Sequence, residues 1–357
     1  MSWAMILSAV AAAVAITAAV MPTALRLAHR YEFLDQPGRH KRHKHPVPLV
    51  GGIILFIALW GSITLVFLVF PGAFEDQTGS LPYLLGGALI VFLVGLSDDL
   101  TPLSAWTKLF AQVAAGLVLY LGGLNINPVS IPFMGNFDIG QFSILITVAW
   151  VVLLTNAVNL IDGLDGLAAG VSLIAAATLA VIGFLYQAGP VVAFACALAG
   201  FLAVFLVYNR YPARTFLGDS GSLQIGFYFA VMSLLVPVKT FTAAALYLPL
   251  MALGVPLLET SISISRRLMA GRNVMKADRR HLFHYLALAG LSPRAIVWIF
   301  YLLSAVFSLF ALAMYFWDRL IVFAILVLFM VVIFALFFIF MTSVNRPGNG
   351  PRSAHRK

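Results

Sequence analysis

The chain alternates between long apolar runs and short polar segments from one end to the other. A helix that crosses a bilayer needs about 20 mostly apolar residues, and eleven runs approach that length. We therefore expect an all-α polytopic membrane protein with about eleven transmembrane helices, a single integral-membrane domain over residues 1–345 and a disordered basic tail over residues 346–357. The expected spans cover roughly residues 3–25, 48–70, 81–97, 105–123, 141–158, 167–187, 190–208, 221–238, 241–265, 295–317 and 320–342.

The composition agrees with this pattern. Hydrophobic residues make up 62% of the chain and charged residues 10%, whereas soluble proteins contain about 45–50% apolar and about 25% charged residues. This balance excludes a disordered chain, a disulfide-stapled secreted domain and a nucleic-acid-binding module. The single cysteine, Cys196, lies in an apolar run, which excludes a thiolate metal cluster as well.

Lysine and arginine are distributed unevenly between the loops. When the runs are numbered along the chain, 20 of the 22 lie in the loops after odd-numbered runs, at the adjoining start of the fourth run (Lys108) or in the C-terminal tail. The other two are Lys239 and Arg319. Positive residues concentrate in cytoplasmic loops, so we expect the C-terminus in the cytoplasm and the N-terminus outside. The net charge of +9 then reflects a basic girdle near anionic lipid headgroups.

Acidic residues are rare, and five of the thirteen lie just beyond the ends of apolar runs on the expected cytoplasmic side. Clustered carboxylates repel one another where the dielectric constant is low, so a site that gathers them needs a cation. Oxygen ligands without cysteine favour Mg²⁺, with Mn²⁺ as a substitute, bridging to a substrate phosphate. We expect an active site at the cytoplasmic face that contains Asp98, Asp99, Asp162, Asp165 and Asp219.

The segment from Asn156 to Leu167 carries the most specific local signal. Polar residues recur there at every third position, and neighbours in such a row share a helix face. Gly163 and Gly166 permit a break in the helix or a close backbone approach. A helix end without function would not explain two asparagines and two aspartates at the bilayer boundary. The row consists of Asn156, Asn159, Asp162 and Asp165.

Other polar segments are suited to phosphate. Gly218 and Gly221 surround Asp219 at an expected helix N-terminus, where backbone N–H groups favour anions. Lys108 is either a snorkelling anchor or a partner for a phosphate or for the acids. In the last large cytoplasmic loop, His281 and His284 share a face if the segment is helical, and two histidines at this spacing are a weak zinc signal.

These segments occur in a fixed order, together with two proline motifs: Asp35-Gln36-Pro37, Pro48–Gly52, Asp98-Asp99, Asn156–Gly166, Phe216–Ser222 and Asp278–His281. In this order they resemble the polyprenyl-phosphate N-acetylhexosamine-1-phosphate transferases, a family that includes muramyl-pentapeptide phosphotransferase. The resemblance implies transfer of a sugar-1-phosphate, GlcNAc-1-phosphate in the first instance, from a UDP-N-acetylhexosamine to undecaprenyl (polyprenyl) phosphate with release of UMP. It also implies bound Mg²⁺ and a multi-pass protein of the bacterial inner (cytoplasmic) membrane, and it leaves open whether the chain forms a homodimer.

By matching position, the resemblance implies a role for each polar segment. Asp98 and Asp99 are the implied catalytic pair and, with Asp219 as the main ligand, the implied Mg²⁺ ligands. Asp162, His281 and His284 complete the implied catalytic set. In the nucleotide-sugar site, Phe216 is implied to stack on uracil and Asp165 to lie closest to the base. The implied substrate-binding residues are Lys108, Asn159, Asp165, Asn209, Phe216, Arg279 and Arg280.

Two positions depart from the pattern of the family branch that initiates envelope glycans. Phe283 stands where that branch has a histidine, and Glu259 stands where it has an aspartate. Both positions lie where sugar specificity can be set. At helical spacing Phe283 points away from the face that His281 and His284 share, so we expect it to pack the loop or to shape the sugar end of the cleft.

Two other functions share part of this sequence pattern. A phospho-MurNAc-pentapeptide transferase of peptidoglycan synthesis would use the same chemistry with another donor, and the short histidine loop disfavours it. An ion-coupled transporter also uses intramembrane carboxylates, but it predicts acids near the span midpoints and matching broken helices in two halves. Here the acids gather toward one membrane face.

Overall fold

The fold is an assembly of long helices with two small hairpins. The computed structural model describes residues 2–37, 45–127, 129–131, 135–235, 253–269 and 281–344. The hairpins pair β1 (Leu34–Asp35) with β2 (Val47–Pro48) and β3 (Val129–Ile131) with β4 (Gly135–Phe137), both antiparallel. The helices are α1 (Trp3–Arg30), α2 (Gly51–Val69), η1 (Pro71–Gln77), α3 (Leu81–Leu100), α4 (Ala105–Leu121), η2 (Gly140–Phe142), α5 (Ser143–Ile161), α6 (Leu167–Leu185), α7 (Gly189–Asn209), α8 (Gly218–Leu234), α10 (Gly254–Met269), α11 (Leu282–Leu288), α12 (Pro293–Phe316) and α13 (Arg319–Val344).

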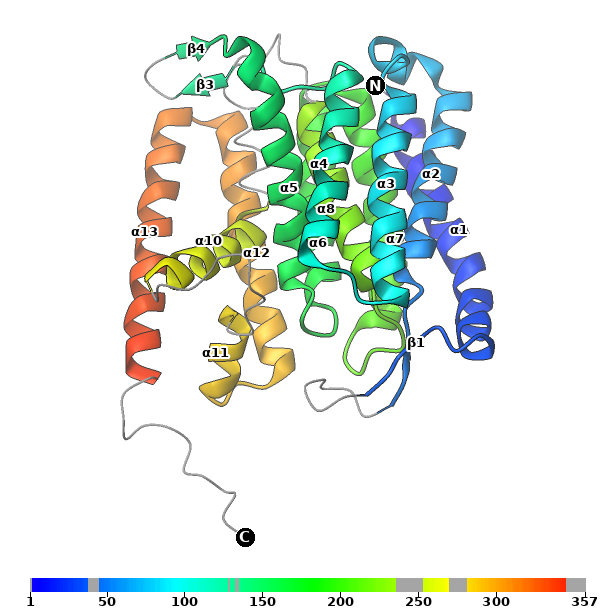
Figure 1. The fold of residues 1–357 in the computed structure, drawn as a ribbon. Coiled ribbons are helices and arrows are strands. Elements are labelled where there is room, and N and C mark those ends of the chain that lie inside the picture. Colours follow the sequence, from blue (N-terminus) through cyan, green and yellow to red (C-terminus); the bar gives the residue numbers. More distant parts are fainter. Residues whose placement is uncertain are drawn as a thin grey trace.

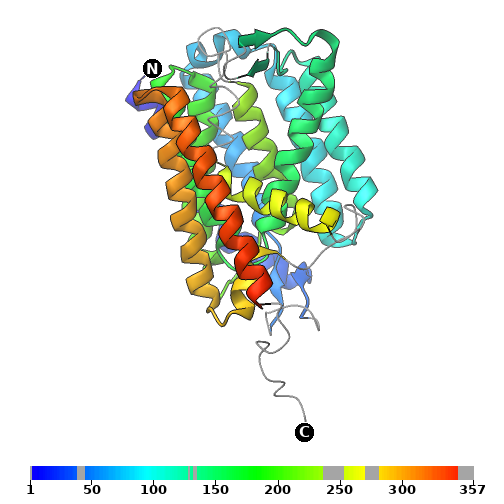
Figure 2. The ribbon, with the colours of Figure 1, turned by 90° about the vertical axis from the view of Figure 1, so that its left-hand side faces the viewer.

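Most helices run along a common axis, so successive turns alternate between the two ends of the bundle (Figure 1). The start of α1 and the β3–β4 hairpin lie at the upper end in this view, and the β1 strand, α11 and the last turn of α13 lie at the lower end. Figure 2 shows α12 and α13 side by side at one edge of the bundle. The exception to the common axis is α10, which crosses α5 and α12 obliquely in both views.

The expected polytopic architecture is confirmed in its class. Among the described residues, eight helices are long and apolar enough to cross a membrane, and each of the eleven expected spans overlaps a helix. The other three helices that overlap expected spans are not among these eight. Helices α4 and α8 are too short, with 17 residues each, and α10 begins at Gly254, well inside its expected span. The count of eleven spans and the assignment of the lower end to the cytoplasm remain predictions.

The core lies around α7 and α8, which are buried on nearly all sides. The side chains of α7 are apolar on all sides of the helix, as expected for a helix inside a bundle. Small residues let the backbones approach closely, as in other membrane bundles: a Cβ at Gly200 of α7 would lie 2.9 Å from the Val10 carbonyl oxygen of α1. The outer helices expose large apolar side chains, including Leu68, Trp298 and Leu328. Such a surface suits contact with lipid rather than water.

Candidate active site

The N-terminus of α8 is held by the carboxylate at the end of α3. The Asp99 Oδ1 atom accepts a hydrogen bond of 2.7 Å from the Asp219 amide, and Oδ2 accepts from the Ser220 amide at 3.1 Å and from the Ser220 hydroxyl. Gly218 has φ +69°, and a Cβ there would lie within 2.6 Å of both Asp99 oxygens. The expected helix N-terminus is therefore present, but its amides bind Asp99, whereas the sequence suggested a phosphate.

The motif Pro48–Gly52 docks α2 against the same turn. The Gly51 and Gly52 amides donate to the carbonyl oxygens of Phe216 and Leu217, each at 3.1 Å, and the Phe216 amide donates to the Pro48 carbonyl oxygen at 2.9 Å. A Cβ at Gly52 would lie 2.1 Å from the Ser220 hydroxyl. The paired glycines are thus needed for close packing beside the carboxylates.

Lys108 lies between two carboxylates. Its Nζ atom is 2.8 Å from Asp219 Oδ2 and 3.3 Å from Asp98 Oδ2. Asn159 donates from Nδ2 to the other oxygen of Asp219 at 3.1 Å and to the Ser222 hydroxyl at 2.9 Å. The side chains of Lys108, Asp98 and Asp219 are 26%, 16% and 24% exposed. The expected clustering of these acids is confirmed, and they converge on one accessible cation position.

The donor set at this position fits Mg²⁺. Within the described residues, no group of three metal-ligating side chains forms a ready metal site. Mg²⁺ does not require one, because it usually keeps several waters and binds one or two carboxylates together with substrate phosphates. Asp98 and Asp219 already direct one oxygen each at the same ammonium. Both oxygens of Asp99 are engaged with α8, so Asp98 and Asp219 are better placed as ligands than Asp99.

The turn between α5 and α6 carries Asp162 and Asp165. The helix ends at Ile161, Asp162 is its C-cap, and Gly166 adopts φ +78° immediately before α6. The helix break expected at the two glycines is therefore confirmed. Asp165 accepts a hydrogen bond of 3.0 Å from the Ala213 amide, which ties this turn to the α7–α8 loop.

Two further side chains hold the same turn by its last residue. The buried Asn209 accepts from the Gly166 amide at 3.0 Å and donates to the Thr215 carbonyl oxygen at 2.9 Å. Tyr301 of α12 donates to the Gly166 carbonyl oxygen at 2.6 Å. Both ends of the Asn209 amide are thus bonded within the protein, a positioning arrangement, while its expected nucleotide contact stays a prediction.

The environment of the Asp162 side chain changes its pKa. Burial, together with the neighbouring carboxylates of Asp219, Asp99 and Asp165, raises the pKa of Asp162 to about 7. A carboxyl group in this range exchanges a proton near neutral pH, which is common at functional sites.

The two histidines contact the ring of Phe283, and Phe283 packs on the α5–α6 turn. His281 is the N-cap of α11 in an extended conformation, so it does not share a helix face with His284, although their ring centroids are 5.9 Å apart. The expectation that Phe283 points away from them is wrong. Its ring lies 5.4 Å from that of His281 and 4.3 Å from that of His284. Phe283 is 2% exposed and packs on Gly163, where an added Cβ would lie 2.4 Å from its Cζ atom. Of the two expected roles, the structure shows packing, and a role in shaping the sugar end of the cleft stays a prediction.

Other expectations have a different outcome. The side chain of Phe216 is half-buried beside the α8 N-terminus, and its stacking on uracil stays a prediction. Arg279 and Arg280 lie outside the described residues. Sequence reasoning missed Tyr301 and Gln224. Tyr301 lies in an apolar run, and no local sequence feature marks it. Gln224 is a single amide side chain within an apolar run, which is a signal that could have been read. Its side chain is fully buried and donates to the carbonyl oxygens of Gly52 and Ser220.

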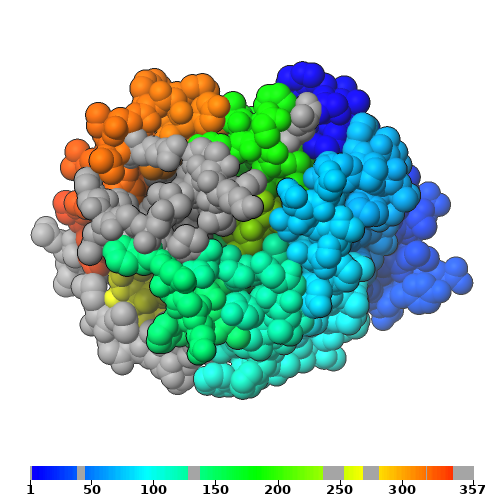
Figure 3. Space-filling view, turned by 90° about the horizontal axis from the view of Figure 1, so that it is seen from above, coloured from blue at the N-terminus to red at the C-terminus, as the bar shows by residue number. Residues whose placement is uncertain are grey.

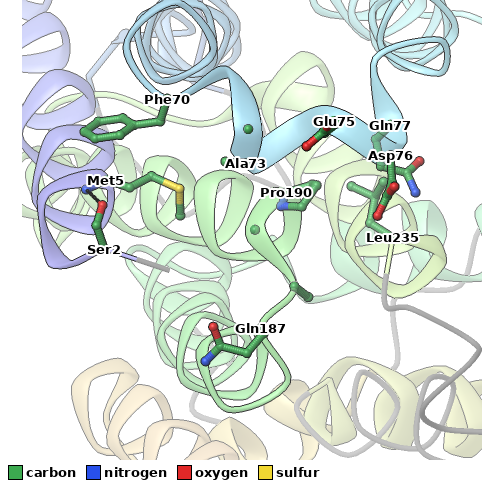
Figure 4. A pocket seen from close by; sticks show the side chains of 13 residues that line it. Ser2, Met5, Phe70, Ala73, Glu75, Asp76, Gln77, Gln187, Pro190 and Leu235 are labelled. Carbon is green, nitrogen blue, oxygen red and sulfur yellow. Dashed lines mark hydrogen bonds between the residues drawn. The ribbon is translucent and has the colours of Figure 1, made fainter.

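A pocket of about 520 Å³ lies at the opposite end of the bundle. Figure 4 shows its lining, where Met5, Phe70 and Pro190 face the acidic residues Glu75 and Asp76 of η1. Figure 3 looks onto this end, with α1 and the α12–α13 turn on opposite sides. The pocket is remote from the carboxylate cluster, so the candidate active site is the cluster at the α8 N-terminus.

Comparison with known proteins points to one family. The sequence model described as glycosyl transferase family 4 matches residues 81–237, which include all five clustered aspartates. A probable undecaprenyl-phosphate N-acetylglucosaminyl 1-phosphate transferase of Bacillus subtilis is 33% identical over 320 residues, covering 88% of this chain and 87% of the relative. A decaprenyl-phosphate N-acetylglucosaminephosphotransferase of Mycobacterium tuberculosis is 34% identical, covering 77% and 74%. A phospho-N-acetylmuramoyl-pentapeptide-transferase of Moorella thermoacetica is 34% identical, covering 77% and 86%.

The raised pKa of Asp162 predicts a pH-dependent loss of stability. The unfolded chain has an ordinary aspartate pKa near 4, so between about pH 4 and pH 7 the folded protein retains a proton that the unfolded chain releases. Stability therefore falls as pH rises through this range. Without divalent cations, Asp162→Asn should raise the melting temperature at pH 8, and this gain should shrink toward pH 4. In the control Asp138→Asn, the hydrogen bond from the Gly140 amide lowers the pKa of the native aspartate, so no such gain should appear. A gain for Asp162→Asn that is independent of pH would contradict the assignment.

The contact between Gly163 and Phe283 predicts a steric effect. Gly163→Ala should destabilise the protein by about 1–3 kcal/mol, the usual cost of overpacking, because the Phe283 ring would have to shift although it is buried and in contact with both imidazoles. Adding Phe283→Leu should recover part of the lost melting temperature. The matched control is Gly79→Ala, where an added Cβ meets nothing within 4 Å and should have no effect. Equal melting temperatures for Gly163→Ala and Gly79→Ala would refute the contact.

Proposed function

This chain belongs to glycosyl transferase family 4, and from that premise we propose that it transfers N-acetylglucosamine-1-phosphate from a UDP-sugar to undecaprenyl phosphate, with release of UMP. The observation that carries the proposal is the convergence of Asp98, Asp219 and Lys108 at the α8 N-terminus. The proposed location is the bacterial cytoplasmic membrane, with the lower end in Figure 1 facing the cytoplasm. The proposed acceptor has a long hydrocarbon tail. This explains why an enzyme would be embedded in the bilayer although its donor is water-soluble.

The proposed reaction is a direct displacement. An oxygen of the lipid phosphate forms a bond to the sugar-bearing phosphorus of the donor, and the bond from that phosphorus to the bridging oxygen breaks, so that UMP leaves. The attacking and receiving groups are both anionic, and cations relieve this repulsion. Bound Mg²⁺, held by Asp98 and Asp219, would supply positive charge to the diphosphate.

The residues around the cluster divide the remaining work. When the donor binds, Lys108 would leave Asp98 and Asp219 and form an ion pair with a substrate phosphate. Asp98 is the better candidate to orient the acceptor or take its proton, because Asp99 is bound to α8 through both oxygens. Asn159 keeps Asp219 in place from the side of α5.

The donor is tested by an exchange assay. The purified protein is incubated with polyprenyl phosphate, Mg²⁺ and one donor at a time, and UMP release is measured. We expect release with UDP-N-acetylglucosamine and little with UDP-MurNAc-pentapeptide. The reverse ranking would support the phospho-N-acetylmuramoyl-pentapeptide transfer for which the Moorella relative is named, and no release with any UDP-sugar would refute the proposal.

The cluster predicts different outcomes for the two adjacent aspartates. Asp98→Asn should lower kcat at least ~100-fold, the scale expected for losing acid–base or metal assistance, with little change in melting temperature. Asp99→Asn should lower both, because an asparagine keeps only one acceptor oxygen for the first turn of α8 and loses the negative charge that a helix N-terminus favours by about 0.3–1 kcal/mol. Chelation should abolish turnover and Mg²⁺ should restore it. A stable Asp99→Asn variant with full activity would contradict this division.

A further inference from the structure

Glu259 makes three contacts with the start of α11 from a buried position on α10. Its side chain is 1% exposed. The Oε1 atom lies 3.1 Å from His281 Nδ1 and accepts a hydrogen bond of 2.9 Å from the Leu282 amide, and Oε2 accepts from the same amide at 3.2 Å. A carboxylate has no proton to donate, so the imidazole nitrogen that faces it must be the protonated one.

This contact determines which atom of His281 is available to a substrate. The hydrogen bond made by one ring nitrogen selects the tautomer and the orientation of the ring. With Nδ1–H directed at Glu259, Nε2 is the only ring nitrogen that can reach a ligand. The ring also stacks on Phe283 at an interplanar angle of 17°, and Phe283 packs on Gly163 beside Asp162. The His281 ring is thus held on two sides next to the acidic turn.

We infer that Glu259 is a positioning residue that holds His281 with Nδ1 protonated and Nε2 turned to the substrate diphosphate. The inference rests on the proposed function for the identity of that ligand, but not for the state of the ring. An alternative role for Glu259 is to cap α11 alone. Asp318 offers a matched control for capping, because its Oδ1 accepts from the Leu320 and Ile321 amides at 2.9 and 3.1 Å at the start of α13.

A double-mutant cycle separates the two roles. Glu259→Gln keeps the shape and one acceptor for Leu282, and it should lower kcat about 10–100-fold, the usual effect of losing a partner that orients a functional histidine. The KM for the donor should change less than about threefold. In the His281→Ala background, Glu259→Gln should have no further effect, because residues that act through one another are not additive. Asp318→Asn should leave kcat unchanged. Equal losses in both backgrounds would show that Glu259 acts on helix stability alone and would overturn the inference.

Nitrogen NMR provides a readout that needs no turnover. In protein labelled with ¹⁵N-histidine, the His281 signals, assigned by their absence in His281→Ala, should show a protonated Nδ1 and an unprotonated Nε2 at neutral pH. Glu259→Gln should shift the ring toward a mixture of tautomers, and Glu259→Asp should restore the native pattern in part. A native ring protonated at Nε2, or a pattern unchanged in Glu259→Gln, would refute the inference. If no UDP-sugar supports turnover but the tautomer responds as expected, the proposed function fails and the positioning role stands.

Discussion

The interaction on which the site depends is the binding of the Asp99 carboxylate by the first turn of α8. A carboxylate at a helix N-terminus is stabilised by unpaired amides and by the helix dipole, which makes an acid tolerable at the end of an apolar helix. Because α8 begins at this contact, its position determines where Asp219 and Ser222 lie. The Asp219 carboxylate in turn contacts Lys108 and Asn159. The positions of the clustered side chains therefore depend on the contact between Asp99 and α8.

A second set of contacts fixes the position of the acidic turn between α5 and α6 relative to the first turn of α8. Three elements contact this turn, through Asn209 of α7, Tyr301 of α12 and the Phe283 ring of α11. Contacts from several elements can hold like charges close together, although the repulsion between those charges lowers the stability of the folded protein. The same turn joins the histidines to the carboxylates, because Phe283 fills the space that a side chain at Gly163 would need.

Much of this arrangement is predictable from the sequence, because long apolar runs and rare polar residues within them carry strong signals. The class of fold, the meeting of the acids at one end and the break at Gly166 follow from spacing and composition. The engagement of Asp99 with α8 does not, since an Asp-Asp pair reads the same whether it faces solvent or an amide. The aromatic stack on Phe283 also escapes sequence reasoning, because His281 is an extended N-cap and helical spacing does not apply to it.

The central claim is that Asp98 and Asp219 form a cation position that Lys108 occupies in the free protein. Electron paramagnetic resonance of Mn²⁺, titrated into the protein with UDP present, tests it directly. We expect Asp98→Asn and Asp219→Asn each to weaken Mn²⁺ binding at least about tenfold. The variant Lys108→Met should bind Mn²⁺ at least as tightly as the native protein, because a competing ammonium is removed. Unchanged Mn²⁺ affinity in both aspartate variants would contradict the account.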